Sequence, residues 1–242
     1  MAGAKKKSAL RDRISDLAWS DAIASLWANG YGRLGGVLTT EECRDLRDLY
    51  GQPNLFRSRV DMARFRFGRG EYKYFTYPLP NLVAGLRLAL YPHLAACANE
   101  WMAALSLKSS FPSELDHFLE HCHQRGQTRP TPLLLHYQAG DFNCLHQDLY
   151  GEVVFPFQVI FALSRPGEDF TGGELMLVEQ QPRAQSTGHV IQLGQGEAVV
   201  ITTRYRPAKG SRSYYRTNLR HGVSRVLTGE RFTMGIVFHD AK

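Results

Sequence analysis

The spacing of hydrophobic and polar residues differs between the two halves of the chain. In the first half, apolar residues recur at the spacing of an α-helix. Helices are predicted at residues 21–29, 39–51, 82–105 and 113–126. Thr39 and Glu42 have the form of a capping box, and Pro92 is expected to kink or split the longest helix. The segment 53–80 is basic and aromatic instead, which favours strands and loops.

Short strands are predicted in the second half. The clearest are residues 133–138, 153–163, 174–178, 197–203 and 231–239. Residues 155–163 are apolar almost throughout, so both faces of that strand are expected to be covered. The last strand alternates, because Arg231 and Thr233 share one face while Phe232 and Met234 share the other. A polar inner face and an apolar outer face indicate a barrel that helices cover on the outside.

These patterns predict an α+β fold with a double-stranded β-helix core, of the jelly-roll or cupin-like type. The N-terminal helices are expected to pack on the outer face of one sheet. Residues 1–20 are interpreted as a basic, partly disordered N-terminal arm, residues 21–130 as a mainly helical region and residues 131–242 as the barrel core. The last two regions are expected to form a single structural unit, because no long linker separates them.

Composition agrees with one globular domain. Of the 242 residues, 43% are hydrophobic and 21% are charged, which suffices for a sizeable core. No apolar run approaches the roughly 18 residues of a membrane span, and the N-terminus lacks the apolar segment of a secretion signal. A cytoplasmic protein without a membrane partner is therefore expected. The four cysteines form no C-x-x-C pair, which is typical of reduced thiols.

Positive charge is concentrated in two segments that also carry aromatic rings. The net charge of +6 permits an anionic partner without identifying one. The segments are residues 57–77 and 204–225, and the second holds no acidic residue. A solvated surface explains most charged runs, but nucleic acid requires the same combination of cations and stacking rings. The candidate substrate residues are Arg64, Arg66, Tyr72, Tyr74, Arg204, Arg212, Tyr214 and Arg216.

Three residues have the chemistry of a metal site. If residues 145–149 are extended, His146 and Asp148 point to the same face, because side chains two apart in a strand do so. His221, from a distant strand, completes two neutral nitrogens and one anionic oxygen around a divalent metal. Such a triad leaves coordination positions open and is typical of non-haem Fe(II) oxygenases. Ordinary hydrogen-bonded surface or core residues are the alternative interpretation.

Several segments resemble the Fe(II)/2-oxoglutarate-dependent oxygenases. His146-Gln147-Asp148, followed by His221 and Arg231, is similar to their iron- and 2-oxoglutarate-binding signature. Residues 170–175, Phe-Thr-Gly-Gly-Glu-Leu, resemble a turn and strand of prolyl-hydroxylase-like members, and Tyr137-Gln138-Ala139-Gly140 resembles a segment of AlkB-type nucleic-acid demethylases. The pattern of the whole chain, including residues 64–68 and 72–75, resembles a bacterial family described as acting on alkylated DNA.

This resemblance implies a cofactor, a co-substrate and the residues that bind them. The implied metal ligands for Fe(II) are His146, Asp148 and His221, and the implied 2-oxoglutarate-binding residues are Arg231, Thr233 and Tyr137. A planar guanidinium binds a carboxylate through two parallel hydrogen bonds, which suits Arg231 to the remote carboxylate of 2-oxoglutarate. O2 is the second co-substrate, and ascorbate is expected to stimulate turnover.

The resulting hypothesis is a dioxygenase that removes an alkyl group from a damaged nucleobase of DNA, single-stranded DNA included, and yields an aldehyde, succinate and carbon dioxide. Two alternatives stay open. A peptidyl hydroxylase of the prolyl type is favoured by residues 172–175 and by the spacing from His221 to Arg231. Leu135, where AlkB-type enzymes have asparagine, is a departure from the demethylase pattern. A non-catalytic, cupin-like module that senses iron or 2-oxoglutarate is disfavoured by Arg231, because a plain metal binder needs no buried guanidinium.

Overall fold

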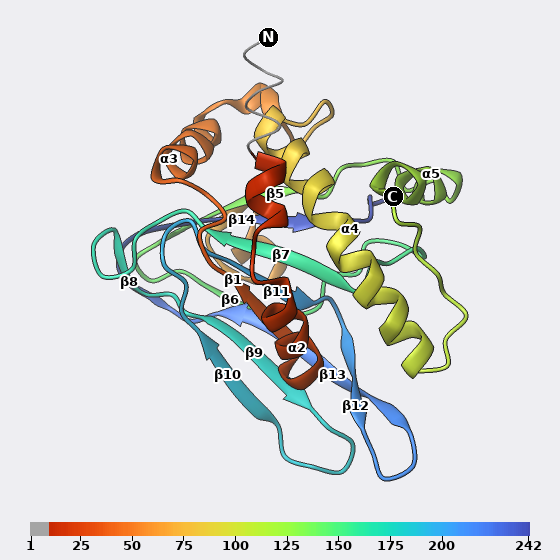
Figure 1. Ribbon diagram of the computed structural model, residues 1–242. Helices are drawn as coiled ribbons and strands as arrows, with labels where there is room; N and C mark the ends of the chain where they lie inside the picture. The colour runs from red at the N-terminus through yellow and green to blue at the C-terminus, as the bar shows by residue number, and fades with distance from the viewer. Residues whose placement is uncertain (1–9) are drawn as a thin grey trace.

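The computed structural model describes residues 10–242, with helices in the N-terminal half and strands through most of the C-terminal half (Figure 1). The helices are α2 (Trp19–Asn29), α3 (Thr40–Asp48), α4 (Asn81–Ala104) and α5 (Leu115–Gln124), and short 3-10 turns form η1 (Leu49–Gly51), η2 (Pro53–Leu55) and η3 (Met62–Phe65). Within the described residues, no helix has the length and apolar character needed to span a membrane.

The strands form two antiparallel sheets. The larger runs in the order β1 (Tyr31–Leu34), β11 (Ala198–Thr202), β7 (Phe157–Ala162), β14 (Val226–Val237), β5 (Leu133–Gln138), β4 (Glu71–Phe75) and β2 (Phe56–Asp61), and β8 (Phe170–Gly172) pairs with β14. The smaller runs in the order β10 (Thr187–Ile191), β9 (Leu175–Gln180), β13 (Tyr214–Val223), β6 (Phe142–His146) and β3 (Gly68–Arg69), and β12 (Tyr205–Lys209) pairs with β13. Leu177, Val199 and Leu219, from both sheets, pack in one interior cluster. The two sheets therefore form the jelly-roll barrel that the sequence predicts.

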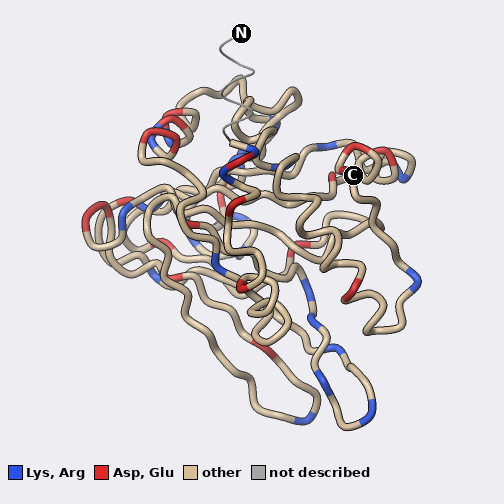
Figure 2. The backbone as a smooth tube through the Cα atoms, viewed as in Figure 1, with Lys and Arg blue, Asp and Glu red and all other residues tan. Residues whose placement is uncertain are grey.

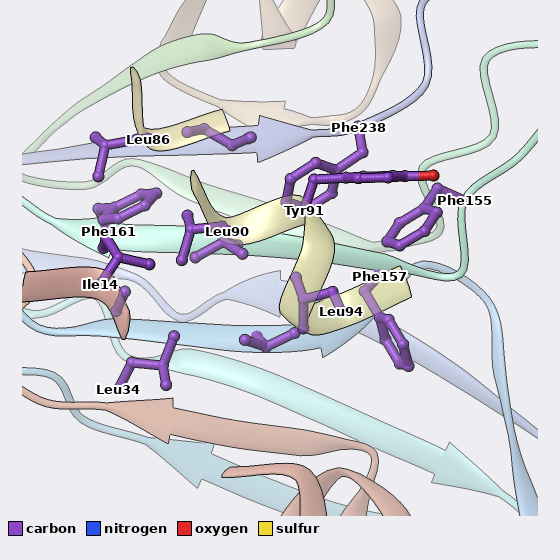
Figure 3. Packing of buried hydrophobic residues seen from close by; sticks show 14 of the residues in the cluster. Ile14, Leu34, Leu86, Leu90, Tyr91, Leu94, Phe155, Phe157, Phe161 and Phe238 are labelled. Atoms are coloured by element: carbon purple, nitrogen blue, oxygen red, sulfur yellow. The ribbon is translucent and has the colours of Figure 1, made fainter. Parts of the chain in front are cut away.

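Helix α4 covers the outer face of the larger sheet (Figure 3). Leu90 and Leu94 of α4 share a buried cluster with Phe157 and Phe161 of β7. Burial of each such side chain contributes about 1.5–3 kcal/mol. Gln158, between the two phenylalanines, faces the inside of the barrel instead. Strand β7 is thus apolar along most of its length because the helix covers one face and the barrel interior the other, as predicted.

The predicted helices are found, with two corrections. Thr39 and Glu42 form both hydrogen bonds of the capping box that begins α3. Pro92 does not split α4, which is continuous from Asn81 to Ala104. The carbonyl that Pro92 leaves without its helical donor belongs to Leu88, which is 50% exposed. Helix α5 begins at Leu115 rather than at residue 113, and no side chain caps it.

The N-terminal arm and one basic segment also differ from expectation. Residues 10–15, expected as part of the arm, are helical, and Leu10 and Ile14 belong to the main core. Residues 1–9, with the three lysines, lie outside the described residues. The basic segment at 204–225 is a β12–β13 hairpin rather than a loop. The buried side chains of β13 include the polar Thr217 and His221. The strand therefore lacks the alternation of apolar and polar residues from which strands are predicted.

Candidate metal and co-substrate site

Strands β6 and β13 bring two histidines face to face. His146 ends β6, and His221 is its direct partner across the antiparallel ladder, with ring centroids 4.2 Å apart. The carboxylate of Asp148 lies 3.5 Å from Nε2 of His146 and 3.2 Å from Nε2 of His221. One ligand atom from each residue lies within 4.8 Å of the others, and the described residues contain no second such group of His, Cys, Asp or Glu.

The segment that carries Asp148 is not the predicted strand, because β6 ends at His146. Gln147 holds it in place, since its amide donates to the backbone carbonyls of Arg204 at 2.9 Å and Leu219 at 2.8 Å. The His146 ring is fixed by a 2.8 Å hydrogen bond from Nδ1 to the Cys144 carbonyl. A carbonyl can only accept, so Nδ1 carries a proton, and Nε2 is the ring nitrogen that faces Asp148.

Two residues that the sequence reasoning missed hold the Asp148 carboxylate. The hydroxyl of Tyr150 donates to Oδ1 at 2.7 Å, and the amide of Gln158 donates to Oδ2 at 2.7 Å. Hydrogen bonds of this kind orient a metal-binding carboxylate. The sequence did carry a signal for one of them, because Gln158 is the one polar residue in the apolar run 155–163.

Electrostatics favour a charged Asp148 and a neutral His221. Burial opposes charge on His146, but the neighbouring Asp148 raises the pKa of its imidazole. Burial opposes charge on Asp148, but hydrogen bonds and charge from His146 and His221 hold the pKa of its carboxyl well below the usual range. Burial lowers the pKa of His221, and the neighbouring His146 lowers it further. An anionic carboxylate beside a neutral imidazole results.

Arg231, Tyr137 and Thr233 lie together on two paired strands. Arg231 of β14 is the direct partner of Tyr137 of β5, and its guanidinium carbon lies 5.4 Å from the centroid of that ring. Arg231 is 7% exposed, forms no ion pair within residues 10–242, and donates only a long 3.5 Å hydrogen bond to Oγ1 of Thr233. Burial raises the pKa of Tyr137 to about 12, so its hydroxyl keeps its proton. Its oxygen accepts a 3.4 Å hydrogen bond from the amide of Asn143.

One cavity of about 350 Å³ joins the metal triad to Arg231. Leu133, Leu135, Ile160 and Leu175 make part of its wall apolar. Four residues of the basic and aromatic segment 57–77 also line it, namely Arg66, Phe67, Tyr72 and Tyr74. This combination of apolar walls and a few convergent polar groups is typical of a small-molecule or cofactor site.

The candidate substrate residues do not lie together. Arg66, Tyr72 and Tyr74 line the cavity, whereas Arg64, in η3, is not among its lining residues. Arg204 lines a separate cavity, and Arg212, Tyr214 and Arg216 lie on the β12–β13 hairpin. Tyr214 and His221 are the first and eighth residues of β13, which places them about 23 Å apart along the strand. The hairpin tip therefore lies far from the metal triad, and no Lys or Arg of residues 204–225 lines the cavity.

A protein family matches most of the chain. Its sequence model is described as "Oxygenase, catalysing oxidative methylation of damaged DNA" and matches residues 70–241. The chain belongs to this family. The predicted resemblance to a family of oxygenases that act on damaged DNA is confirmed. The match begins within the basic-aromatic segment and extends through α4, α5 and the barrel.

Two curated relatives of this oxygenase come from Mycobacterium tuberculosis. The uncharacterized proteins Rv2227 (strain ATCC 25618 / H37Rv) and MT2286 (strain CDC 1551 / Oshkosh) are each 51% identical over 167 residues, which is 69% of this chain and 72% of theirs. Their names assign no activity.

Solved structures similar to this oxygenase share its fold. A 2OG-Fe(II) oxygenase family oxidoreductase from Burkholderia pseudomallei has a TM-score of 0.54 and 15% identity, covering 93% of this chain and 92% of its own. A Trichoplax adhaerens prolyl hydroxylase, in complex with a hypoxia inducible factor peptide fragment, has a TM-score of 0.52 and 16% identity, covering 96% and 92%. The double-stranded β-helix fold is confirmed, and the protein is an oxygenase whose His-Asp-His group is a candidate iron site.

Proposed function

We propose that this oxygenase removes an alkyl group from a damaged nucleobase of DNA by oxidation. The observation that carries the proposal is the cavity of about 350 Å³, which has the His-Asp-His triad on one wall and Phe67, Tyr72 and Tyr74 on others. A base must leave the double helix to reach such a pocket, and stacking on aromatic rings then compensates for the lost base stacking. Arg66, at the same cavity, supplies a cation for the phosphate backbone.

The triad fits Fe(II) in donor type, protonation and charge. His146, Asp148 and His221 offer two imidazole nitrogens and one carboxylate, the donor set of non-haem Fe(II) oxygenases. Tyr150 and Gln158 each donate a hydrogen bond to one oxygen of the Asp148 carboxylate and so orient it. Fe(II) bound there, together with 2-oxoglutarate and O2, would supply the oxidising power of the reaction.

Arg231 is suited to bind the remote carboxylate of 2-oxoglutarate. It is a buried guanidinium that forms no ion pair among the described residues, since Glu174 acts on it only from beyond ion-pair distance, and such a charge is costly unless an anion pairs with it. Thr233 lies beside it and offers a hydroxyl, and Tyr137 offers a protonated phenol from the facing strand. An unpaired, buried arginine also argues against a module that only senses iron.

The products follow from the balance of atoms. One oxygen atom of O2 enters a C–H bond of the alkyl group, and the other enters succinate as 2-oxoglutarate loses carbon dioxide. The hydroxylated alkyl group on nitrogen is a hemiaminal, which breaks its C–N bond to give an aldehyde and the repaired base. Adding a methyl group would instead require a methyl donor, so oxidation at this site favours removal of the methyl group from damaged DNA.

The substrate test compares DNA with peptide. The protein is incubated with Fe(II), 2-oxoglutarate, ascorbate and O2, and with either methylated single-stranded DNA, the same DNA unmethylated, or a peptide library. We expect formaldehyde only from the methylated DNA, with ascorbate increasing the number of turnovers. A gain of one oxygen atom on a peptide, with no formaldehyde from DNA, would establish the peptidyl hydroxylase alternative.

A further inference from the structure

A second cavity, of about 420 Å³, lies next to the candidate active site. It is formed between the end of α4, the residues that lead into α5, the segment after Asp148 and the start of β12. Its lining combines apolar residues with polar and cationic ones, among them Lys108, Ser110, Phe111, Leu149, Arg204 and Tyr205. The function proposed above does not use this cavity.

One short segment forms part of the wall of both cavities. Asp148 and Tyr150 line the first cavity, whereas Leu149 between them lines the second and is 41% exposed. Gln147 lines the first cavity and is bonded at 2.9 Å to the carbonyl of Arg204, which lines the second. Residues 147–150 therefore separate the two cavities, with the exposed Leu149 on the side of the second.

The second cavity carries unbalanced positive charge. Lys108 and Arg204 form no ion pair within the described part of the chain, whereas Glu152, an acid in the lining, lies 3.9 Å from Arg125. The guanidinium carbons of Arg204 and Arg216 lie 6.0 Å and 5.2 Å from the centroid of the Tyr205 ring. Figure 2 shows that Lys and Arg continue along the β12–β13 hairpin, on which no Asp or Glu lies. The cavity is thus the inner end of a basic, aromatic surface.

We propose that the second cavity binds the nucleotide that neighbours the damaged one in the same DNA strand. This inference rests on the proposed function. The base would lie against Leu149 and Phe111, and its phosphate would be neutralised by Lys108 and Arg204. The volume lies within the range of ligand pockets, and the common wall gives a continuous strand access to both cavities. The hairpin then contacts nucleotides further along the strand.

Oligonucleotides that lack one base test this assignment. Three single-stranded oligonucleotides carry one methylated base, and two of them have an abasic site immediately 5′ or 3′ to it. Binding is measured by fluorescence anisotropy with Fe(II) and 2-oxoglutarate but without O2, so that no turnover occurs. We expect one of the two abasic strands, and not the other, to bind at least about five-fold more weakly than the intact strand.

Two variants with matched controls locate the effect. Leu149→Ala should reduce the difference in affinity between the abasic and intact strands. Leu227 is 64% exposed and lines neither cavity, so Leu227→Ala should leave that difference unchanged. Lys108→Ala should weaken binding of all three strands. It should also reduce the slope of log affinity against log salt concentration by about one, the contribution of one phosphate contact. Arg44→Ala, an exposed cation on α3, should do neither. Thermal unfolding checks that each variant is folded.

The outcomes separate this inference from the proposed function. Formaldehyde production from the intact strand is measured in parallel, with O2 present. Formaldehyde with equal binding of all three strands would overturn the nucleotide site and leave the proposed function standing. Equal effects of Lys108→Ala and Arg44→Ala on the affinity for DNA and on its salt dependence would also overturn the nucleotide site. Absence of formaldehyde would overturn the proposed function itself.

Discussion

His146 and His221 are direct partners across the antiparallel pair of β6 and β13. A change of one residue in this register would turn one imidazole to the opposite face of the sheet. The register is irregular immediately afterwards, between His221 and Val223. Strand pairing, rather than any local motif, therefore brings the second imidazole to Asp148.

The first prediction concerns the hydrogen bonds to Asp148. Gln158→Leu and Tyr150→Phe each remove one donor from the carboxylate, at 2.7 Å in both cases. We expect each variant to bind Fe(II) about 10–100-fold more weakly, because the carboxylate loses its orientation. Calorimetric titration with Fe(II) under nitrogen, or with Mn(II), measures the affinity. Gln195→Leu is the control, since it loses a similar amide donor that bonds only to the Leu163 carbonyl. Equal affinities in all variants would exclude this role.

The second prediction concerns the turn before β9. Gly173 has φ +64°, and a Cβ there would lie 2.9 Å from Cδ of Arg231. Gly173→Ala should displace the guanidinium and raise the KM for 2-oxoglutarate about 10-fold, with Fe(II) affinity unchanged. Gly167 has φ +83° and no heavy atom within 4 Å of its Cβ position, so Gly167→Ala has similar backbone strain without the contact. The same increase in KM for both alanine variants would show that backbone strain alone is responsible.

The third prediction is a pH dependence of stability that comes from His239. This residue is fully buried, and burial lowers its pKa from 6.5 to about 4. Between those values the unfolded chain binds a proton that the folded chain does not. The stabilisation is therefore complete above pH 6.5, is lost as the pH falls toward 4, and amounts to ~3 kcal/mol.

A variant isolates this contribution. Nδ1 of His239 accepts a 3.2 Å hydrogen bond from the backbone N–H of Phe155, and the side-chain oxygen of His239→Asn can accept the same bond. Urea unfolding between pH 7 and pH 4 should show a shallower loss of stability in the variant than in the wild type. Parallel curves for the two proteins would contradict the assignment.

The fourth prediction concerns a buried ion pair at the end of β14. Arg87 donates to Asp240 at 2.8 Å, and the two side chains are 1% and 0% exposed. Arg87→Met removes the buried cation and leaves the Asp240 carboxylate with only Tyr77 and the half-exposed His123, which should cost about 3–5 kcal/mol of unfolding free energy. Adding Asp240→Asn should recover part of this loss, because the uncompensated charge is removed. Urea unfolding measures both, and a purely additive loss would argue against coupling of the pair.

The barrel and the nature of the site were predictable because each has a local signature. The alternation from Arg231 to Met234 indicates one polar and one apolar face, and the structure places Arg231 and Thr233 at the cavity and Met234 in the outer core. The capping box at Thr39 is equally local, since all its atoms lie within four residues. Patterns of this kind need no knowledge of distant contacts.

What the sequence could not provide depends on pairing between distant segments. The β12–β13 hairpin has polar residues on both faces, so its strands lack the periodicity on which prediction relies. Tyr150 is part of the site because Gln147 fixes the segment after β6 to the distant carbonyls of Arg204 and Leu219, and the sequence alone does not reveal these partners. Similarly, the separation between the hairpin tip and His221 follows from strand length and pairing, not from composition.

The most direct test of the account is the yield of formaldehyde and succinate from methylated single-stranded DNA, measured for the wild type and for His146→Ala. With Fe(II), 2-oxoglutarate and O2, the wild type should form the two products in equal amounts. His146→Ala should form neither, with its folding verified by thermal unfolding. Formaldehyde from the folded His146→Ala variant would contradict the assignment of the triad, and succinate without formaldehyde from the wild type would contradict the assignment of the substrate.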